Sequence, residues 1–244
     1  MESPVALKHI FHRILAALLV SSGGLFNSAY AELSTPQAPD TIAARVQACA
    51  ICHGNQGEGT DNDYFPRLAG KPADYLYNQL QHFREGRRKY APMNYLVTYL
   101  SDDYLREIAV YYANLHPPYP VPEPSNLPLS QLERGRRIAL NGDSARNVPA
   151  CIACHGAKLT GAEPAIPGLV GLHADYISAQ LGAWRSGVRH AAAPDCMHTI
   201  AIQLSDADIR AVSTWLALQP APPDATPAPA GSLKLPLNCG SQPH

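Results

Sequence analysis

The sequence has little methionine, few aromatic residues and no excess of charge of either sign. Only 3 of its 244 residues are methionine, and phenylalanine, tryptophan and tyrosine together make up 7%. Its 19 basic and 20 acidic side chains leave a formal net charge of −1. Because nucleic-acid-binding proteins carry a strongly basic surface, this balance argues against a nucleic-acid partner.

Long apolar runs are also missing. The longest, residues 14–26, contains Ser21 and Ser22 and is shorter than the roughly 20 residues that a membrane-spanning helix needs. Basic residues precede it and the small-x-small sequence Ala29-Tyr30-Ala31 follows it, which indicates a cleaved signal peptide over residues 1–31. A retained membrane anchor is the alternative. We expect a periplasmic protein with at most a peripheral association with the membrane.

The few cysteines carry most of the information. Cys49-Ala50-Ile51-Cys52-His53 recurs as Cys151-Ile152-Ala153-Cys154-His155. Two thiols at this spacing can bond to the vinyl groups on one edge of a porphyrin, and the histidine that follows can ligate its iron. Each segment therefore predicts one covalently bound haem c. Zinc ligation and a thioredoxin-like dithiol are the alternatives, but the sequence shows neither four converging ligands nor a βαβ pattern.

Both segments belong to a longer internal repeat. Two further blocks recur in the same order, Pro66-Arg67-Leu68-Ala69-Gly70 as Pro167-Gly168-Leu169-Val170-Gly171 and Leu100-Ser101-Asp102 as Leu204-Ser205-Asp206. The repeat predicts two small domains, each of which would need a buried haem to complete its apolar core. The predicted divisions are domains at 32–117 and 130–219, a Pro-rich linker at 118–129, and a Pro-rich tail at 220–244 that is loosely ordered unless Cys239 tethers it.

Apolar periodicity predicts helices in both halves. One short helix is expected over residues 41–48, and a longer one opens at Pro72 and ends near Gly86. Ser101 is expected to cap the last helix of the first half, whose buried face is predicted to be Leu105, Ile108, Ala109 and Tyr112. A capping-box pattern at Ser130 is expected to start the first helix of the second half. Both later methionines are expected on loops.

Those methionines, Met93 and Met197, are candidates for the sixth iron ligand. Each lies about 40 residues after its histidine, His53 or His155, at matching points of the repeat. A thioether ligand favours Fe(II), raises the reduction potential and leaves no open coordination position. Such closed coordination is typical of an electron carrier rather than of an enzyme.

Cys196 and Cys239 are left outside the haem motifs. In an exported protein an even remainder suggests a disulfide between them, with two unpaired thiols as the alternative. Cys196, His190 and His198 also lie close enough to Met197 in the sequence to compete with it for the second iron.

Four arginines occupy matching positions in the two halves. They are Arg84 and Arg88 in the first half, and Arg185 and Arg189 in the second. Haem propionates need charged donors, so these side chains are candidate propionate ligands; a solvated basic face is the alternative. Trp184, which corresponds to Phe83, is expected to pack on the haem edge.

Taken together, these features resemble the dihaem cytochrome c4 family. The resemblance rests on the paired Cys-x-x-Cys-His motifs, the Pro-x-Leu-x-Gly blocks, the segment from Gln79 to Arg88 with its second copy, and the two methionines, and it covers about residues 42–218. It implies an all-α protein of two class I cytochrome c domains, related by a pseudo-twofold axis with their haem propionate edges close together. Family members shuttle single electrons in the periplasm, often toward terminal oxidases.

The expected function is thus that of a non-enzymatic carrier with two covalent haem c groups, taking electrons from a membrane complex or a copper protein to a terminal oxidase. One alternative is a dihaem oxidoreductase, either a peroxidase or a thiosulfate dehydrogenase-like enzyme with Cys196 as distal ligand. Another is a fixed cytochrome subunit of a larger redox complex. Because the second site has its own loop and tail, we expect two unequal reduction potentials.

Overall fold

The computed structural model describes residues 40–62 and 64–242, so the signal peptide expected at 1–31 lies outside the described residues. Within those ranges, none of the helices has the length and apolar character needed to span a bilayer. Apart from two strands of two residues each, the regular secondary structure of the described chain is helical, which confirms the all-α prediction.

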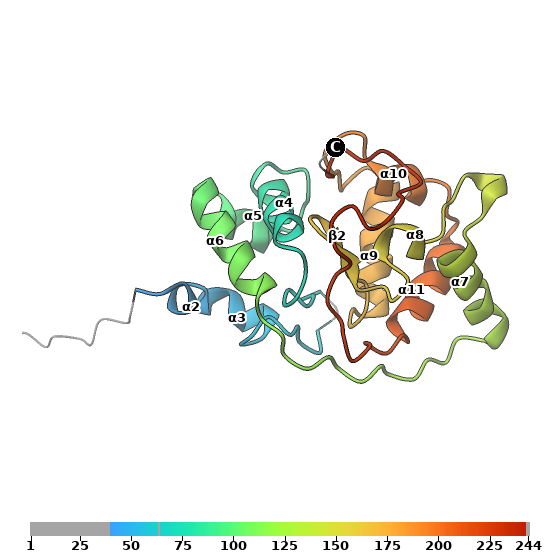
Figure 1. The fold of residues 1–244 in the computed structure, drawn as a ribbon, viewed down its shortest axis with the longest axis horizontal. Helices are drawn as coiled ribbons and strands as arrows, with labels where there is room; N and C mark the ends of the chain where they lie inside the picture. The colour runs from blue at the N-terminus through green and yellow to red at the C-terminus, as the bar shows by residue number, and fades with distance from the viewer. Residues whose placement is uncertain (1–39, 63, 243–244) are drawn as a thin grey trace, which may run out of the picture. The chain divides into compact units, whose positions relative to one another are not determined.

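Two sets of helices follow one another along the chain (Figure 1). The first set is α2 (Ile42–Arg45), α3 (Gln47–His53), α4 (Ala73–Arg84), α5 (Ala91–Val97) and α6 (Asp102–Ala113). The second set is α7 (Leu129–Asn141), the 3-10 helix η1 (Ser144–Arg146), α8 (Ile152–His155), α9 (Ala174–Arg185), α10 (Cys196–Ala201) and α11 (Asp206–Ala217). Two short strands, β1 (Gly161–Ala162) and β2 (Ile166–Pro167), pair antiparallel between α8 and α9. Residues 114–128 form neither helix nor strand, and they include all of the predicted Pro-rich linker except Leu129, with which α7 begins.

In the first half, α6 packs against α4 and α2. The Ser101 hydroxyl accepts a hydrogen bond from the backbone N–H of Tyr104, which confirms it as the N-cap of α6. The predicted buried face of that helix is also confirmed: Leu105, Ile108, Ala109 and Tyr112. The buried apolar side chains form two separate clusters, one of five residues and one of three.

In the second half, α7 and α9 pack against α11 around a single cluster of twelve buried side chains. Gly135 makes the close approach of α7 to α11 feasible, because a Cβ at this position would lie 2.1 Å from the carbonyl oxygen of Ala211. A capping box between Ser205 and Asp208 begins α11. The second half therefore has the larger apolar core of the two.

Three predictions about local structure were wrong. The first helix breaks at Val46 into α2 and α3. Ser130 lies inside α7, which begins directly after Pro128 without a side-chain cap. Met93 and Met197 lie on the short helices α5 and α10 rather than on loops, because Pro92 suits the first turn of α5 and the Asp195 carboxylate caps α10.

The tail after α11 is held to the second half at two points. The backbone of Ala228 bonds with β1 and the residue after it, accepting from Glu163 at 2.8 Å and donating to Gly161 at 2.9 Å. Farther on, a disulfide joins Cys239 to Cys196, with an S–S distance of 1.98 Å and a Cα–Cα distance of 5.4 Å. The tail is thus tethered where Cys239 was expected to tether it.

Candidate functional site

A continuous cavity of about 800 Å³ is lined by residues of both halves, most of them apolar. It brings together all the predicted haem-attachment and iron-ligating residues: Cys49, Cys52, His53, Met93, Cys151, Cys154, His155 and Met197. Arg88, Arg189 and Trp184 also line it.

The two histidines of the repeated motifs are held by backbone carbonyl groups. The Nδ1 of His53 lies 2.9 Å from the carbonyl oxygen of Pro66, and that of His155 lies 2.8 Å from the carbonyl oxygen of Pro167. A carbonyl only accepts, so Nδ1 carries the hydrogen and the lone pair of Nε2 is left for a metal. Burial lowers the pKa of both imidazoles, which favours the neutral form that a metal needs.

Among the described residues, none of the four cysteines of the motifs forms a disulfide. Cys49 and Cys52 lie on α3, while Cys151 directly precedes α8 and Cys154 lies in it. Burial raises the pKa of Cys49 and Cys154, and that of Cys151 to about 12. A raised pKa favours the protonated form of these three thiols, in contrast to the lowered pKa of a reactive dithiol. Among the described residues, no group of three or more His, Cys, Asp or Glu side chains is placed to hold a metal ion.

The residue after each methionine anchors its helix in the same way. Asn94 donates from Nδ2 to the carbonyl of Phe83 at 2.5 Å, and the His198 Nδ1 lies 2.8 Å from the carbonyl of Trp184, the matching position. Sequence reasoning missed this pair, because an amide and an imidazole share no obvious pattern. Their common signal is that each follows a methionine at the same point of the repeat.

Of the side chains that could compete with Met197, none is available as an iron ligand in this arrangement. His198 is turned to the Trp184 carbonyl, and neither it nor His190 lines the cavity. Cys196 does line the cavity, but its sulfur is bonded to Cys239.

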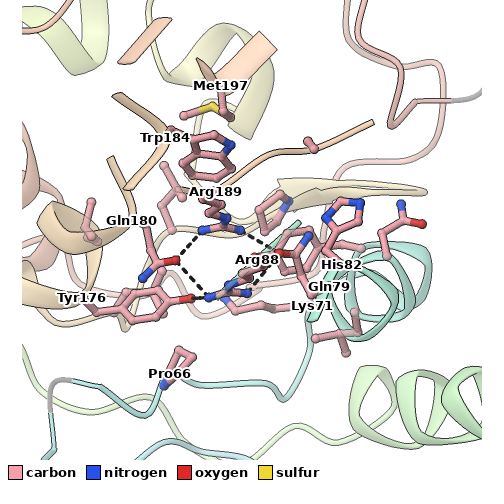
Figure 2. Close-up of a pocket in the computed structure, with 18 of the residues that line it drawn as sticks. Pro66, Lys71, Gln79, His82, Arg88, Tyr176, Gln180, Trp184, Arg189 and Met197 are labelled. Atoms are coloured by element: carbon pink, nitrogen blue, oxygen red, sulfur yellow. Dashed lines mark hydrogen bonds between the residues drawn. The ribbon is translucent and has the colours of Figure 1, made fainter. Parts of the chain in front are cut away.

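Two arginines and two glutamines form a cross-braced group between the halves (Figure 2). Arg88 donates to the Oε1 atoms of Gln79 and Gln180, both at 3.0 Å, and Arg189 donates to the same two atoms at 2.7 and 2.6 Å. Arg88 also donates to the Tyr176 hydroxyl at 2.8 Å. Each half thus contributes one arginine and one glutamine, and the four side chains lock the halves together.

A glycine turns each of these arginines back toward the cavity. Gly86 and Gly187 have φ angles of +73° and +71°, which favour glycine, and they reverse the chain after α4 and α9. The guanidinium carbon of Arg88 then lies 4.5 Å from the centre of the Phe83 ring. That of Arg189 lies 3.7 Å from the Trp184 ring.

This group lacks an anion. Arg88 and Arg189 are buried, and within the described part of the chain neither forms an ion pair with a carboxylate. Burial and the charge of Arg88 lower the pKa of Arg189 to about 10. The indole Nε1 of Trp184 is also buried without a hydrogen-bond partner. Haem propionates would supply both the negative charge and the missing acceptor, so these residues fit the group that the cysteines predict.

The structure does not place Arg84 and Arg185 with them. Arg84 donates to the carbonyl of Leu100 at 2.7 Å and pairs with Asp102, and Arg185 makes the matching bonds to Leu204, at 3.1 Å, and Asp206. Neither arginine lines the cavity. We therefore correct the prediction for these two: they tie α4 to the start of α6, and α9 to the start of α11.

Sequence comparison decides the family. A profile of the cytochrome c family matches residues 41–108 and 132–219. A thiosulfate dehydrogenase electron acceptor of Thiomonas intermedia is 40% identical over 86% of this chain and 93% of its own length. Cytochrome c4 of Pseudomonas aeruginosa is 34% identical over 84% of this chain and 98% of its own. The chain belongs to the dihaem cytochrome c4 family.

Solved structures agree with this cytochrome c4 assignment. Reduced cytochrome c4 from Pseudomonas stutzeri superposes with a TM-score of 0.63 and 30% identity, over 72% of this chain and 95% of the other. The thiosulfate dehydrogenase TsdBA from Marichromatium purpuratum superposes with a TM-score of 0.66 and 33% identity, over 74% of this chain, which spans only 39% of that longer chain. As in its relatives, the two cytochrome c domains carry two covalent haem c groups, and the protein functions in electron transfer.

Proposed function

We propose that this protein is a periplasmic electron carrier without an enzymatic activity of its own, holding one haem c in each half. Each haem supplies a one-electron Fe(II)/Fe(III) couple. The residues proposed to hold the first haem are Cys49, Cys52, His53 and Met93, and those for the second are Cys151, Cys154, His155 and Met197. Arg88 and Arg189 are proposed to bind the propionates.

The matched anchoring of the two methionines carries this proposal. Asn94 and His198 hold α5 and α10 by the same type of bond, although the side chains differ. Each helix is thereby positioned to keep its thioether in the cavity that also contains the histidine of the same half. A histidine and a methionine on one iron leave no coordination position for a substrate.

The state of Cys196 argues against the thiosulfate dehydrogenase-like alternative. That mechanism needs a free thiolate as distal ligand, and here the sulfur is held in a disulfide with Cys239. The peroxidase alternative needs an open or easily displaced ligand position, which the two anchored methionines would deny.

The comparisons favour a sulfur-oxidising enzyme as the electron donor. Two curated relatives, 40% and 38% identical to this chain, are named as electron acceptors of thiosulfate dehydrogenase. We therefore propose a thiosulfate dehydrogenase as the donor, in place of the membrane complex or copper protein expected from the sequence. A terminal oxidase stays the proposed acceptor.

Rapid mixing distinguishes an electron carrier from an enzyme that oxidises thiosulfate itself. The oxidised protein is mixed with thiosulfate alone, and with thiosulfate plus a catalytic amount of thiosulfate dehydrogenase, while the haem absorbance is followed. We expect both haems to be reduced only when the enzyme is present. Catalytic oxidation of thiosulfate by this protein alone, with a separate acceptor dye, would contradict the proposal.

Spectroscopy tests the ligands. The oxidised protein should show a methionine-to-iron charge-transfer band from both haems and should not bind carbon monoxide when reduced. Met93→Ala and Met197→Ala should each remove about half of that band and open one haem to carbon monoxide. These two variants are matched controls for each other.

A fixed cytochrome subunit is the second candidate, and one comparison favours it. The TsdBA chain that this protein resembles is more than twice as long as the aligned part, so a similar unit exists there within a larger redox protein. Size-exclusion chromatography of extracts at low and high salt separates the two cases. A free carrier elutes at about its own mass, 26.3 kDa before processing, whereas a fixed subunit elutes with its complex.

A further inference from the structure

The side chain of Lys71, a residue of the first half, contacts the backbone of the second half. Its Nζ donates a hydrogen bond to the carbonyl oxygen of Gly168 at 2.8 Å. The side chain is only 7% exposed and lines the cavity that contains the predicted ligands of both haems (Figure 2). Burying an ammonium group is costly, so a lysine at such a place calls for an explanation.

The carbonyl that Lys71 binds belongs to the segment that holds His155. Gly168 directly follows Pro167, whose own carbonyl accepts from the His155 Nδ1 at 2.8 Å. The segment has no room to shift, because a Cβ on Gly168 would lie 2.7 Å from the carbonyl oxygen of Thr160. Two successive carbonyls of one tight segment are therefore held, one by the imidazole and the other by the lysine.

This arrangement has no counterpart in the opposite direction. In the repeat, Lys71 corresponds to Leu172 and Gly168 corresponds to Arg67. Leucine cannot donate a hydrogen bond. The Arg67 guanidinium is turned toward the linker, where it donates to the carbonyls of Pro117 and Pro118 at 2.6 and 3.0 Å. Among the described residues, a buried lysine or arginine of one half thus reaches the histidine segment of the other half only at the second site.

No carboxylate side chain of the described residues pairs with this lysine. In the described chain, Lys71 forms no ion pair, and the charged group that acts on it is the guanidinium of Arg67. Burial, with Arg67 as a smaller cause, lowers the pKa of Lys71 to about 7. A positive charge in a low-dielectric interior acts strongly on neighbouring charges.

We propose that Lys71 is a positioning residue for the second haem, which steadies the segment bonded to His155 and raises the reduction potential of that haem above the potential of the first. The electrostatic reason is that a nearby cation disfavours the more positive Fe(III) state. The proposal rests on the proposed function in one respect, the assignment of His155 as an iron ligand.

The test is a redox titration below pH 7, where Lys71 carries its charge because its pKa is lowered only to about 7. The two haems are resolved in the titration, and Met197→Ala assigns the signals of the second. Lys71→Leu copies the residue found at the matching position, and Lys71→Gln keeps a hydrogen-bond donor without the charge. In both variants we expect the potential of the second haem to fall, so that the equilibrium distribution of one electron between the haems shifts about tenfold toward the first. For a one-electron couple this shift corresponds to about 59 mV. The potential of the first haem should change much less.

Two controls accompany these variants. Lys71→Arg retains the charge and should keep most of the wild-type difference in reduction potential between the two haems. Lys158→Leu removes a lysine of the second half whose side chain is 60% exposed, and it should shift neither potential because solvent screens that charge. Haem content and melting temperature show which variants are folded.

The inference is overturned if folded Lys71→Leu and Lys71→Gln leave the difference in reduction potential between the two haems unchanged, or if the potentials of both haems shift equally. A failure of the proposed function would look different, because the wild-type protein itself would then lack the methionine-to-iron band. The two failures are therefore distinguishable in one set of samples.

Discussion

The two halves of this molecule hold the same set of haem-binding side chains in surroundings that differ. The first half has apolar clusters of five and three buried residues, whereas the second has one cluster of twelve. Only the second half, among the described residues, carries a disulfide and a docked tail, and tail residues Leu235 and Leu237 line the cavity. In the first half, Tyr95 on α5 and Tyr99 after it are exposed to solvent.

The comparison teaches which contacts the chemistry requires. The carbonyl bond to each histidine, the anchor after each methionine and the arginine turned back by a glycine occur in both halves. The single large apolar cluster, the reciprocal capping box, the disulfide-linked tail and Lys71 are found in one half alone among the described residues. We infer that the shared contacts set the type of iron site, and that the unshared ones set the stability and potential of each half.

The largest expected effect comes from removing one haem. Cys49→Ala with Cys52→Ala, or Cys151→Ala with Cys154→Ala, should halve the haem content. The first pair should lose much more helical signal, because the small clusters of the first half cannot replace the apolar contacts of a haem. Absorbance and far-ultraviolet circular dichroism measure both quantities. Equal losses of helical signal in the two variants would contradict the prediction that the first half depends more on its haem.

Substitution of Asp208 should have the next largest effect, on the unfolding free energy of the second half. Its buried carboxylate accepts from Arg134 and Arg146, both at 2.7 Å. Asp208→Asn leaves these cations without their partner and should lower the unfolding free energy of the second half by about 3 kcal/mol. The matching residue of the first half is Tyr104, and Tyr104→Phe is the control, expected to cost less than about 1 kcal/mol. Denaturant unfolding followed at each haem separates the halves.

The same carboxylate predicts a pH dependence. Burial alone would raise the pKa of Asp208, but hydrogen bonds from Arg134, Arg146 and Ser205 outweigh it and hold the pKa far below its usual range. A lowered pKa in the folded state stabilises above the unfolded value of about 3.9, and this contribution is lost as the pH falls through the folded pKa. The second half should thus lose stability below about pH 4, and Asp208→Asn should flatten that part of the profile.

Removing the disulfide should have a somewhat smaller effect. Cys196→Ser with Cys239→Ser opens a link between residues 43 positions apart, which typically costs about 2–3 kcal/mol. The loss should appear only in the unfolding of the second half. Protease cleavage of the tail should become faster, because Gly240 would no longer be held near Pro194, to which it donates at 3.0 Å. Unchanged protease resistance would show that the remaining tail contacts suffice.

The smallest effect is expected from Arg84→Gln and Arg185→Gln. Their partners Asp102 and Asp206 are largely exposed, so each change should cost less than about 1 kcal/mol and should affect the two halves alike. Neither change should move a reduction potential. A clear potential shift in either variant would restore these arginines as propionate ligands.

The sequence by itself determined the cofactor and its number, and it predicted the attachment points. The Cys-x-x-Cys-His spacing lies within two helical turns, so its chemistry is local and readable without a fold. The buried face of α6 was readable for the same reason, because helix periodicity is a local property. The start of α7 was misread because Pro128 and Ser130 are both common near a helix start.

Only the tertiary structure decided which charged residues reach the cavity. Arg84 and Arg88 stand four positions apart in one basic run, yet one binds the start of α6 and the other lies between the halves. Lys71 is an ordinary lysine in the sequence and becomes significant only because it meets Gly168. Such contacts join segments far apart in the chain, and their energies depend on burial and on the partner that folding supplies.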